Sequence, residues 1–199
     1  MANYPEAIED LIRLFSTLPG VGRKTAERYV FFLLRQPPAM VQQYITKFQS
    51  VQNDINLCES CFCYTAATAC DICSNFSRDD STVCVVPESS TIFAIEHIGD
   101  YNGKYHVLGG TINQLDGVGP EQLRLRQLAK RVKAGSIKEI IIAMNPDVSG
   151  EASALYIIET LKPYNVKITK LARGLPAGSD IEFADDVTLG NALKDRKII

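Results

Sequence analysis

Apolar residues in the first part of the chain recur at helical spacing in two successive segments. The first set, which predicts an amphipathic helix over residues 5–17, is Ile8, Leu11, Ile12 and Phe15. The second set, which predicts a helix over residues 23–35 that ends before two prolines, is Ala26, Val30, Leu33 and Leu34. Because the short sequence LPGVG joins the two segments, we expect a helical hairpin, and a third helical segment follows over residues 39–55.

From residue 81 the pattern changes to short runs rich in β-branched residues. We expect strands at 81–86, 91–96, 105–110, 138–144 and 166–172, with helices at 120–134 and 151–162 between the later ones. Strands that alternate with helices favour a largely parallel sheet covered on both faces. The polar stretch 74–81 is the expected boundary between the two halves, and the segment after Arg173 has loop chemistry followed by a short helical pattern.

Composition and charge narrow the class of protein. The chain has 199 residues, of which 46% are hydrophobic, and a formal net charge of -2. It can bury one good core or two modest ones, and any affinity for nucleic acid must come from a local patch. Its apolar runs are far shorter than the roughly 20 residues that span a bilayer, and its first residues lack the pattern of a secretion signal. We therefore expect a cytoplasmic protein with no membrane contact.

Four of the six cysteines form two Cys-x2-Cys pairs, Cys58 with Cys61 and Cys70 with Cys73, in a segment too irregular for a helix or a strand. This spacing is typical of a closed tetrahedral site in which four thiolates bind one structural Zn²⁺. An iron–sulfur cluster and four merely buried cysteines remain the alternatives. The two other cysteines, which we expect to be small buried residues, are Cys63 and Cys84.

The charged residues of the cysteine segment argue against DNA binding by the segment itself. Only Glu59 and Asp71 are charged between Cys58 and Cys73, and four thiolates with one Zn²⁺ add two net negative charges. Such a surface would repel a phosphate. We therefore interpret the segment as a structural staple that joins the helical hairpin to the sheet domain.

Basic residues surround the glycine turn of the expected hairpin. The residues that we expect to contact DNA are Gly20, Gly22, Arg23, Lys24 and Arg28. A glycine turn that opens into a helix presents free backbone N–H groups and the positive end of the helix dipole, which suit a phosphate. The alternatives are a turn that only reverses the chain and a solvated charged face. If DNA binds here, the binding should be independent of sequence and strongly dependent on salt.

An acidic loop with Asn145, Asp147 and Glu151 follows a predicted buried strand, at the place where open α/β sheets bind ligands. The loop resembles the metal motif of Toprim domains, found in topoisomerases and primases, which normally carries Asp at both of the first two positions. Toprim domains also carry a Glu at the end of their first strand, where this chain has Pro87 followed by Glu88. Because an amide and a proline weaken the oxygen shell that Mg²⁺ prefers, we favour a weak ion site or an acidic docking surface over catalysis.

The remaining candidate residues carry less chemical information. His97 and His106 lack a companion Ser, Cys or second His at a recognisable spacing, so we expect core or surface roles. The turn DGVGP precedes a predicted helix whose basic residues are Arg124, Arg126, Lys130, Arg131 and Lys133. This helix is either a second, weaker face for the DNA backbone or an ordinary exposed helix.

The order of these motifs resembles that of the RecR family of bacterial recombination mediators. The motifs are LPGVGRKTAER, the two Cys-x2-Cys pairs, YHVLGG, LDGVGPEQL, NPDVSGEA and ARGLPAGSDIEFADDVTLGNAL, which together cover nearly the whole chain. The resemblance implies an α+β multidomain fold. Its parts would be a helix-hairpin-helix domain (1–53), a four-cysteine zinc finger (54–78), a degenerate Toprim domain (79–174) and a C-terminal Walker B-like segment for oligomerisation (175–199).

The same resemblance implies a function without known catalytic activity. Family members bind DNA, form dimers or ring-like tetramers, and act with RecO and RecF to load RecA at single-strand gaps and breaks. Carried to this chain, the resemblance implies DNA contact by Lys24 and Arg28, zinc binding by the four paired cysteines, and RecO contact by Glu151 with Asp147 beside it. The chain departs from the family at Pro87, usually Glu, and at Asp147, often an uncharged residue.

In a ring-shaped oligomer, the basic hairpin of each subunit would contact the same DNA, so the number of phosphate contacts would multiply. Each subunit could then bind DNA with a net charge near zero. The alternative function is a metal-dependent Toprim enzyme that cuts or joins strands.

Overall fold

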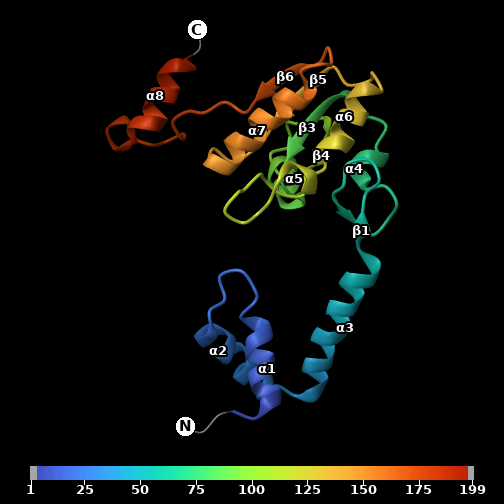
Figure 1. The fold of residues 1–199 in the computed structure, drawn as a ribbon, viewed down its shortest axis with the longest axis vertical. Helices are drawn as coiled ribbons and strands as arrows, with labels where there is room; N and C mark the ends of the chain where they lie inside the picture. Colours follow the sequence, from blue (N-terminus) through green and yellow to red (C-terminus); the bar gives the residue numbers. More distant parts are fainter. Residues whose placement is uncertain (1–3, 197–199) are drawn as a thin grey trace. The chain divides into compact units, whose positions relative to one another are not determined.

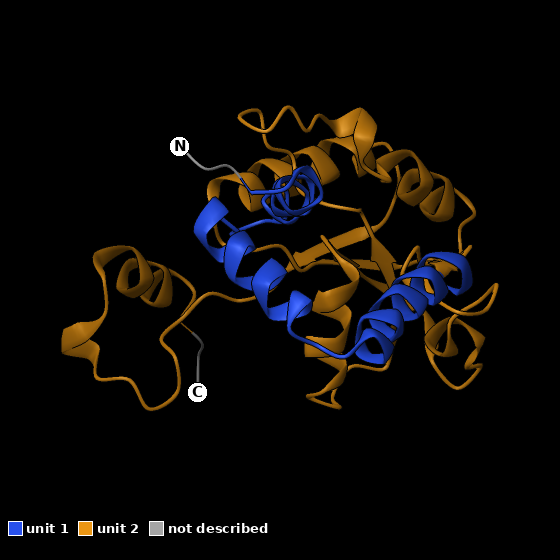
Figure 2. Cartoon of the chain, turned by 90° about the horizontal axis from the view of Figure 1, so that it is seen from below, with its two compact units in different colours: residues 1–55 blue, residues 56–199 orange. Residues whose placement is uncertain are grey.

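The structure is a computed structural model that describes residues 4–196, and it divides into two compact units. The first unit ends at Ile55 and the second begins at Asn56, as the colours of Figure 2 show. Each unit has its own hydrophobic core, so the two are described separately.

The first unit contains a helical hairpin and one longer helix (Figure 1). Its elements are α1 (Glu6–Phe15), α2 (Arg23–Leu34) and α3 (Pro38–Asp54). Ile12 of α1 packs with Ala26 and Val30 of α2, and none of the three is exposed. The expected hairpin is confirmed, although Leu34, which we expected on its apolar face, is exposed.

The turn between α1 and α2 depends on its two glycines. Gly20 has a φ of 75°, in the left-handed region that glycine adopts without steric cost. Gly22 is extended and precedes the first turn of α2, where no side chain caps the backbone N–H groups. Between the two glycines, Val21 packs against the hairpin core. The turn therefore anchors to the core and leaves the N-terminal N–H groups of α2 open to a ligand.

The second unit is built on a four-stranded parallel sheet. Its strands are β3 (Asp79–Val86), β4 (Gly103–Val107), β5 (Glu139–Ile142) and β6 (Lys167–Lys170), in the spatial order β4-β3-β5-β6. Every neighbouring pair is parallel, and Val85 of β3 lies between His106 of β4 and Ile142 of β5. The expected parallel sheet is confirmed.

Alternate residues of β3 face two different cores, as the period of a strand requires. Val83 and Val85 join the core formed with α6 (Leu125–Lys133) and α7 (Val148–Leu161). Cys84 and Val86 join a second core formed with α5 (Ser89–Glu96) and the cysteine segment. The cysteine segment therefore packs with α5 on one side of the sheet and also along its β4 edge, where the N–H of Val107 donates to the carbonyl oxygen of Cys61 at 2.8 Å.

Short elements frame the cysteine segment, contrary to the irregular structure that we expected. β1 (Asn56–Leu57) pairs antiparallel with β2 (Tyr64–Thr65), and α4 (Asp71–Ser74) follows. Because the cysteines share a core with β3, the expected boundary at 74–81 is wrong as a division between compact units. The four family-based domain ranges remain a prediction.

Residues 91–96, which we expected to form a strand, belong to helix α5. Ile92 and Ile95 are three residues apart and pack into the second core, whereas Phe93 between them is 69% exposed. The run is rich in β-branched residues, but the parallel neighbours β3 and β4 need a crossover connection between them. Helix α5 provides that crossover.

The other elements lie close to the expected ranges. The helix expected at 120–134 is a 3₁₀ turn (Pro120–Gln122) followed by α6, and α7 begins at Val148 rather than at 151. The C-terminal part contains a 3₁₀ turn (Ile181–Phe183) and α8 (Asp186–Lys194), in which no residue is buried. Among residues 4–196, no helix is both long and apolar enough to cross a bilayer.

Candidate functional sites

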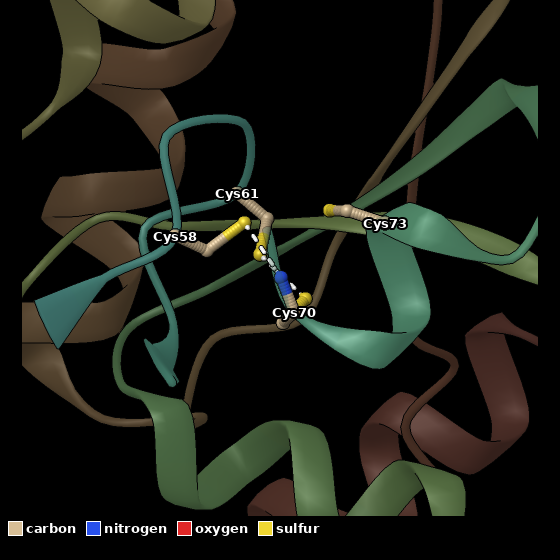
Figure 3. A group of neighbouring side chains, drawn as sticks. All are labelled: Cys58, Cys61, Cys70 and Cys73. Atoms are coloured by element: carbon tan, nitrogen blue, oxygen red, sulfur yellow. Dashed lines mark hydrogen bonds between the residues drawn. The ribbon is translucent and has the colours of Figure 1, made fainter. Parts of the chain in front are cut away.

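The structure brings the four paired cysteines together. The Sγ atoms of Cys58, Cys61, Cys70 and Cys73 all lie within 4.8 Å of one another. Figure 3 shows the four side chains converging from the turn after β1 and from α4, where Cys70 is the N-cap residue. The backbone N–H of Cys70 donates a hydrogen bond to Cys58 Sγ at 3.4 Å and so ties the two pairs to each other.

The geometry of this cluster fits a tetrahedral metal ion. With Zn–S bonds of about 2.3 Å, sulfur atoms in a tetrahedron lie about 3.8 Å apart, and the Sγ atoms of Cys61 and Cys70 are 3.5 Å apart. Burial raises the pKa of the Cys58 thiol, but backbone hydrogen bonds, chiefly from Cys61 and Cys70, outweigh it and lower the pKa to about 6. The backbone therefore already favours a thiolate at Cys58. Four cysteine ligands would leave no open position for a reacting water.

Cys63 is buried as expected, but it also lies beside the cluster, a contact that the sequence did not lead us to expect. Its Sγ atom is 3.3 Å from Cys61 Sγ. Burial raises the pKa of Cys63 to about 12, so that it stays a neutral thiol. The pattern Cys61-x-Cys63 could have indicated this contact. Cys84, also buried as expected, lies in the second core, where burial raises its pKa to about 12.

In the acidic loop, each carboxylate has a local partner. Asp147 is the N-cap of α7, and its Oδ1 accepts a hydrogen bond of 2.7 Å from the backbone N–H of Gly150. Glu151 pairs with Lys170 at 2.5 Å and also with Arg173. Asn145 is exposed, and its carbonyl oxygen closely approaches Gly150, which leaves no room for a Cβ atom there. The loop is thus a well-formed strand-to-helix connection.

The neighbouring strand end carries Pro87, where Toprim domains have a carboxylate. Pro87 is buried, and its carbonyl oxygen accepts hydrogen bonds of 2.9 Å from the N–H groups of both Gly109 and Gly110. Glu88 is exposed at the start of α5. Within residues 4–196, the four cysteines are the only group of three or more Cys, His, Asp or Glu side chains placed to hold a metal ion.

At the hairpin turn, the basic residues differ in their partners. The guanidinium of Arg23 donates two hydrogen bonds of 2.9 Å to the Glu9 carboxylate and lies 3.4 Å from Glu27. Glu9 raises the pKa of Arg23. By contrast, Lys24 and Arg28 are exposed, and neither has an ion-pair partner within residues 4–196. The first turn of α2 also contains no acidic residue. Lys24 and Arg28 are therefore the cations of the turn that are open to an external anion.

The two histidines have ordinary structural positions, as expected. His97 is exposed at the C-terminus of α5. His106 in β4 is fully buried, and its Nε2–H donates to the carbonyl oxygen of Arg124 at 2.9 Å. Its Nδ1 accepts from Arg131 Nη1 at 3.3 Å. Burial, together with the charge of Arg131, lowers the pKa of His106 to about 3.

The basic residues of α6 divide into two groups. Arg124 lies over the ring of Phe62 at 5.5 Å, and Arg131 donates a hydrogen bond of 2.7 Å to the carbonyl oxygen of Tyr105. These two arginines connect α6 to the cysteine segment and to β4. The residues left exposed on the helix are Arg126, Lys130 and Lys133.

Comparison with known proteins agrees with this architecture. Family models described as "RecR, helix-hairpin-helix", "Toprim domain" and "RecR, C-terminal" match residues 8–45, 81–172 and 174–197, respectively. The chain thus belongs to the class of proteins that combine a helix-hairpin-helix domain with a Toprim domain, and here a four-cysteine cluster lies between the two matches.

Full-length relatives specify the family. The chain is 44% identical over 194 residues to "Recombination protein RecR" of Paenarthrobacter aurescens (strain TC1), and the alignment covers 98% of each chain. It is 42% identical over 196 residues to "Recombination protein RecR" of Tropheryma whipplei (strain Twist), and the alignment covers 98% of this chain and 99% of the relative. The chain belongs to the RecR family, as its motifs indicated.

Proposed function

We propose that the chain is a DNA-binding mediator of recombinational repair that acts without catalysis of its own. In this proposal it works in the bacterial cytoplasm, binds DNA independently of sequence, and helps RecO and RecF to load RecA at single-strand gaps and breaks. The name "Recombination protein RecR" of its relatives supports a role in recombination. The single observation that carries the DNA-binding part is the open N-terminus of α2 with Lys24 and Arg28 beside it.

The positions of the polar groups explain how this turn would hold a phosphate. The free N–H groups at the start of α2 supply donors, and the helix dipole favours an anion there. Lys24 and Arg28 are one helical turn apart, so they can meet neighbouring phosphates of one strand. Gly20 and Gly22 leave room for the close approach of the backbone to DNA. Arg23 is less available to a phosphate, because its guanidinium donates to the Glu9 carboxylate.

The acidic loop supports a role in docking rather than in strand cleavage. A metal-dependent enzyme needs carboxylate oxygens that are free to bind Mg²⁺. Here Asp147 caps α7, Glu151 is paired with Lys170 and Arg173, and position 145 carries an amide. We propose Asp147 and Glu151 as the contact for RecO, which would then have to compete with Lys170 and Arg173 for the Glu151 carboxylate.

We further propose that the four cysteines hold one structural Zn²⁺ per chain. The donor set of four thiolates suits zinc, and the sulfur positions suit a tetrahedron. Bound zinc would stabilise the packing of the cysteine segment against the sheet, because the cysteines belong to the core shared with β3 and α5. Metal analysis and the absorption spectrum of purified protein distinguish zinc from an iron–sulfur cluster.

The experiment that tests the proposed function is binding of a gapped duplex, measured by fluorescence anisotropy across a salt series. Lys24→Glu combined with Arg28→Glu should abolish binding without unfolding the protein. The matched control is Lys138→Glu combined with Lys162→Glu, which changes the net charge equally on exposed residues of the sheet unit and should retain binding. Unchanged affinity in the Lys24/Arg28 variant would contradict the proposal.

Two further readouts test the remaining parts. The same samples with Mg²⁺, run on a denaturing gel, should contain intact strands, and Mg²⁺-dependent cleavage lost in Asp147→Ala would favour the Toprim enzyme instead. Light scattering should find a dimer or a ring tetramer under binding conditions. If a strictly monomeric form binds DNA as tightly as the assembled protein, the proposal that a ring multiplies phosphate contacts fails.

A further inference from the structure

Lys104 of β4 fixes the backbone of the second cysteine pair. The side chain is only 6% exposed. Its Nζ donates to the carbonyl oxygens of Ile72, Cys73 and Asn75 at 2.9, 3.1 and 2.8 Å. An ammonium group has three protons, so these three acceptors use its full donor capacity. The acceptors lie at the C-terminal end of α4, where a cation is favourable. Lys104 therefore brings a nearly buried positive charge to the edge of the cluster.

Arg131 of α6 brings a second cation to the same place. It lines a cavity of about 500 Å³ together with Lys104 and Cys73. Its guanidinium is oriented by Tyr105 and His106, through the hydrogen bonds described above. Burial lowers the pKa of Arg131, while thiolates of the cluster, Cys73 foremost, act in the opposite direction and raise it. Arg131 is thus a partly buried cation beside Cys73, where the thiolates of a metal-loaded cluster would stabilise its charge.

The charge of a metal-loaded cluster calls for such neighbours. Four thiolates and one divalent ion carry two net negative charges, and a buried charge is costly unless an opposite charge lies close by. The other charged groups around the cavity are Glu59, Asp80 and Lys130, and all three are exposed. Asp80 lies 3.6 Å from Lys104 but is 77% exposed, so water screens most of its charge.

We propose that Lys104 and Arg131 supply the positive charge that stabilises the metal-loaded four-cysteine site. This inference rests on the proposed metal centre. The two residues are positioning residues and not ligands: Lys104 holds the backbone around Cys73, and both cations offset the charge of the thiolates. Partners of this kind, outside the ligands themselves, typically change metal affinity by about 10- to 100-fold when they are replaced.

The test begins with the zinc content of the wild-type protein. If the purified wild type holds no metal, the proposed metal centre fails, and the inference fails with it. If it holds one zinc per chain, competition with a chromophoric chelator then measures zinc affinity in three variants. Arg131→Gln and Lys104→Met should each weaken affinity by about 10-fold or more. The matched control, Lys130→Met, removes an exposed lysine from the same cavity and should leave the affinity unchanged.

Two comparisons separate a charge effect from simple loss of packing. Arg131→Lys keeps the charge and should recover most of the affinity that Arg131→Gln loses. In denaturant unfolding, Arg131→Gln should lose more stability relative to the wild type when zinc is bound than when both proteins are metal-free, where the lost contacts are the hydrogen bonds to Tyr105 and His106. Wild-type zinc affinity in Arg131→Gln, or equal destabilisation of the two forms, would overturn the proposal. If Lys104→Met does not fold, the zinc affinity and stability of Arg131→Gln alone decide whether the proposal holds.

Discussion

The Oδ1 atom of Asp147 accepts a hydrogen bond of 2.7 Å from the backbone N–H of Gly150. Asp147, which belongs to the Toprim-like metal motif, is thus the N-cap of α7. This bond satisfies one of the free donors at the start of α7. Position 150 also requires glycine, because the carbonyl oxygen of Asn145 lies too close for a Cβ atom there. The local fold therefore accounts for both Asp147 and Gly150 without any metal ion.

We predict that Asp147→Ala destabilises the protein by about 1 kcal/mol, the typical value of an N-cap side chain. Chemical denaturation measures this difference. Asp147→Asn keeps a side-chain oxygen that can accept from Gly150, so it should stay close to the wild type. An Asp147→Ala variant as stable as the wild type would show that the cap contributes nothing.

The second prediction separates Cys63 from the four proposed ligands. The Sγ atom of Cys63 lies beside that of Cys61, but Cys63 is not one of the four cysteines whose sulfur atoms all lie within 4.8 Å of one another. Cys63→Ser should therefore retain one metal ion per chain, whereas Cys61→Ser should lose it. Metal analysis after gel filtration checks both variants. Loss of metal from Cys63→Ser with retention in Cys73→Ser would mean that the ligand set is different.

The sequence predicts those parts of the fold that depend on local patterns. The helical hairpin follows from apolar spacing and from the glycine turn, and the metal site follows from the spacing of Cys58, Cys61, Cys70 and Cys73. Helix α5 does not follow from local pattern, because its β-branched run looks like a strand until the parallel pairing of β3 with β4 requires a crossover. Tertiary context decides its conformation.

The sequence also does not predict which partners the charged residues contact. Arg23 and Lys24 are neighbours with similar chemistry, but Glu9, from the preceding helix, binds only Arg23. Lys104 and Arg131 are far apart in sequence from the cysteines that they approach, and no spacing rule relates them. Contacts between distant segments depend on the assembled fold, so they can be read only from the structure.

The third prediction uses the pairing of Arg23 with Glu9. Glu9→Gln removes the carboxylate that accepts both hydrogen bonds of the guanidinium and leaves Glu27, 3.4 Å away, as the remaining ion-pair partner among the described residues, so Arg23 becomes more available to a phosphate. We expect tighter DNA binding and a salt dependence steeper by up to about one phosphate contact per chain. Fluorescence anisotropy across a salt series measures both. The control is Glu6→Gln, which makes the same change of charge at an exposed position of α1.

In this control, Arg23 stays bound to Glu9, so the affinity should rise only by the small amount that net charge alone produces. Equal gains in Glu9→Gln and Glu6→Gln would mean that freeing Arg23 adds no contact. That result would place the DNA contacts of the turn on Lys24 and Arg28 alone.

The last prediction concerns His106 and the pH dependence of stability. Its pKa in the folded protein is lowered to about 3, whereas the pKa of an unperturbed histidine is about 6.5. Between these two values the unfolded chain binds a proton that the folded chain does not, so stability falls as the pH decreases. The contribution of neutral His106 is fully present above about pH 6.5, and its loss approaches about 1.4 kcal/mol per pH unit below that value.

His106→Gln can still donate to the Arg124 carbonyl but does not titrate. Denaturant unfolding from pH 7 down to pH 5 should therefore give a smaller loss of stability in the variant than in the wild type. The thiolate site is common to both proteins, so the difference between them isolates His106. Parallel stability curves would mean that His106 takes up its proton in the folded protein as readily as in the unfolded chain.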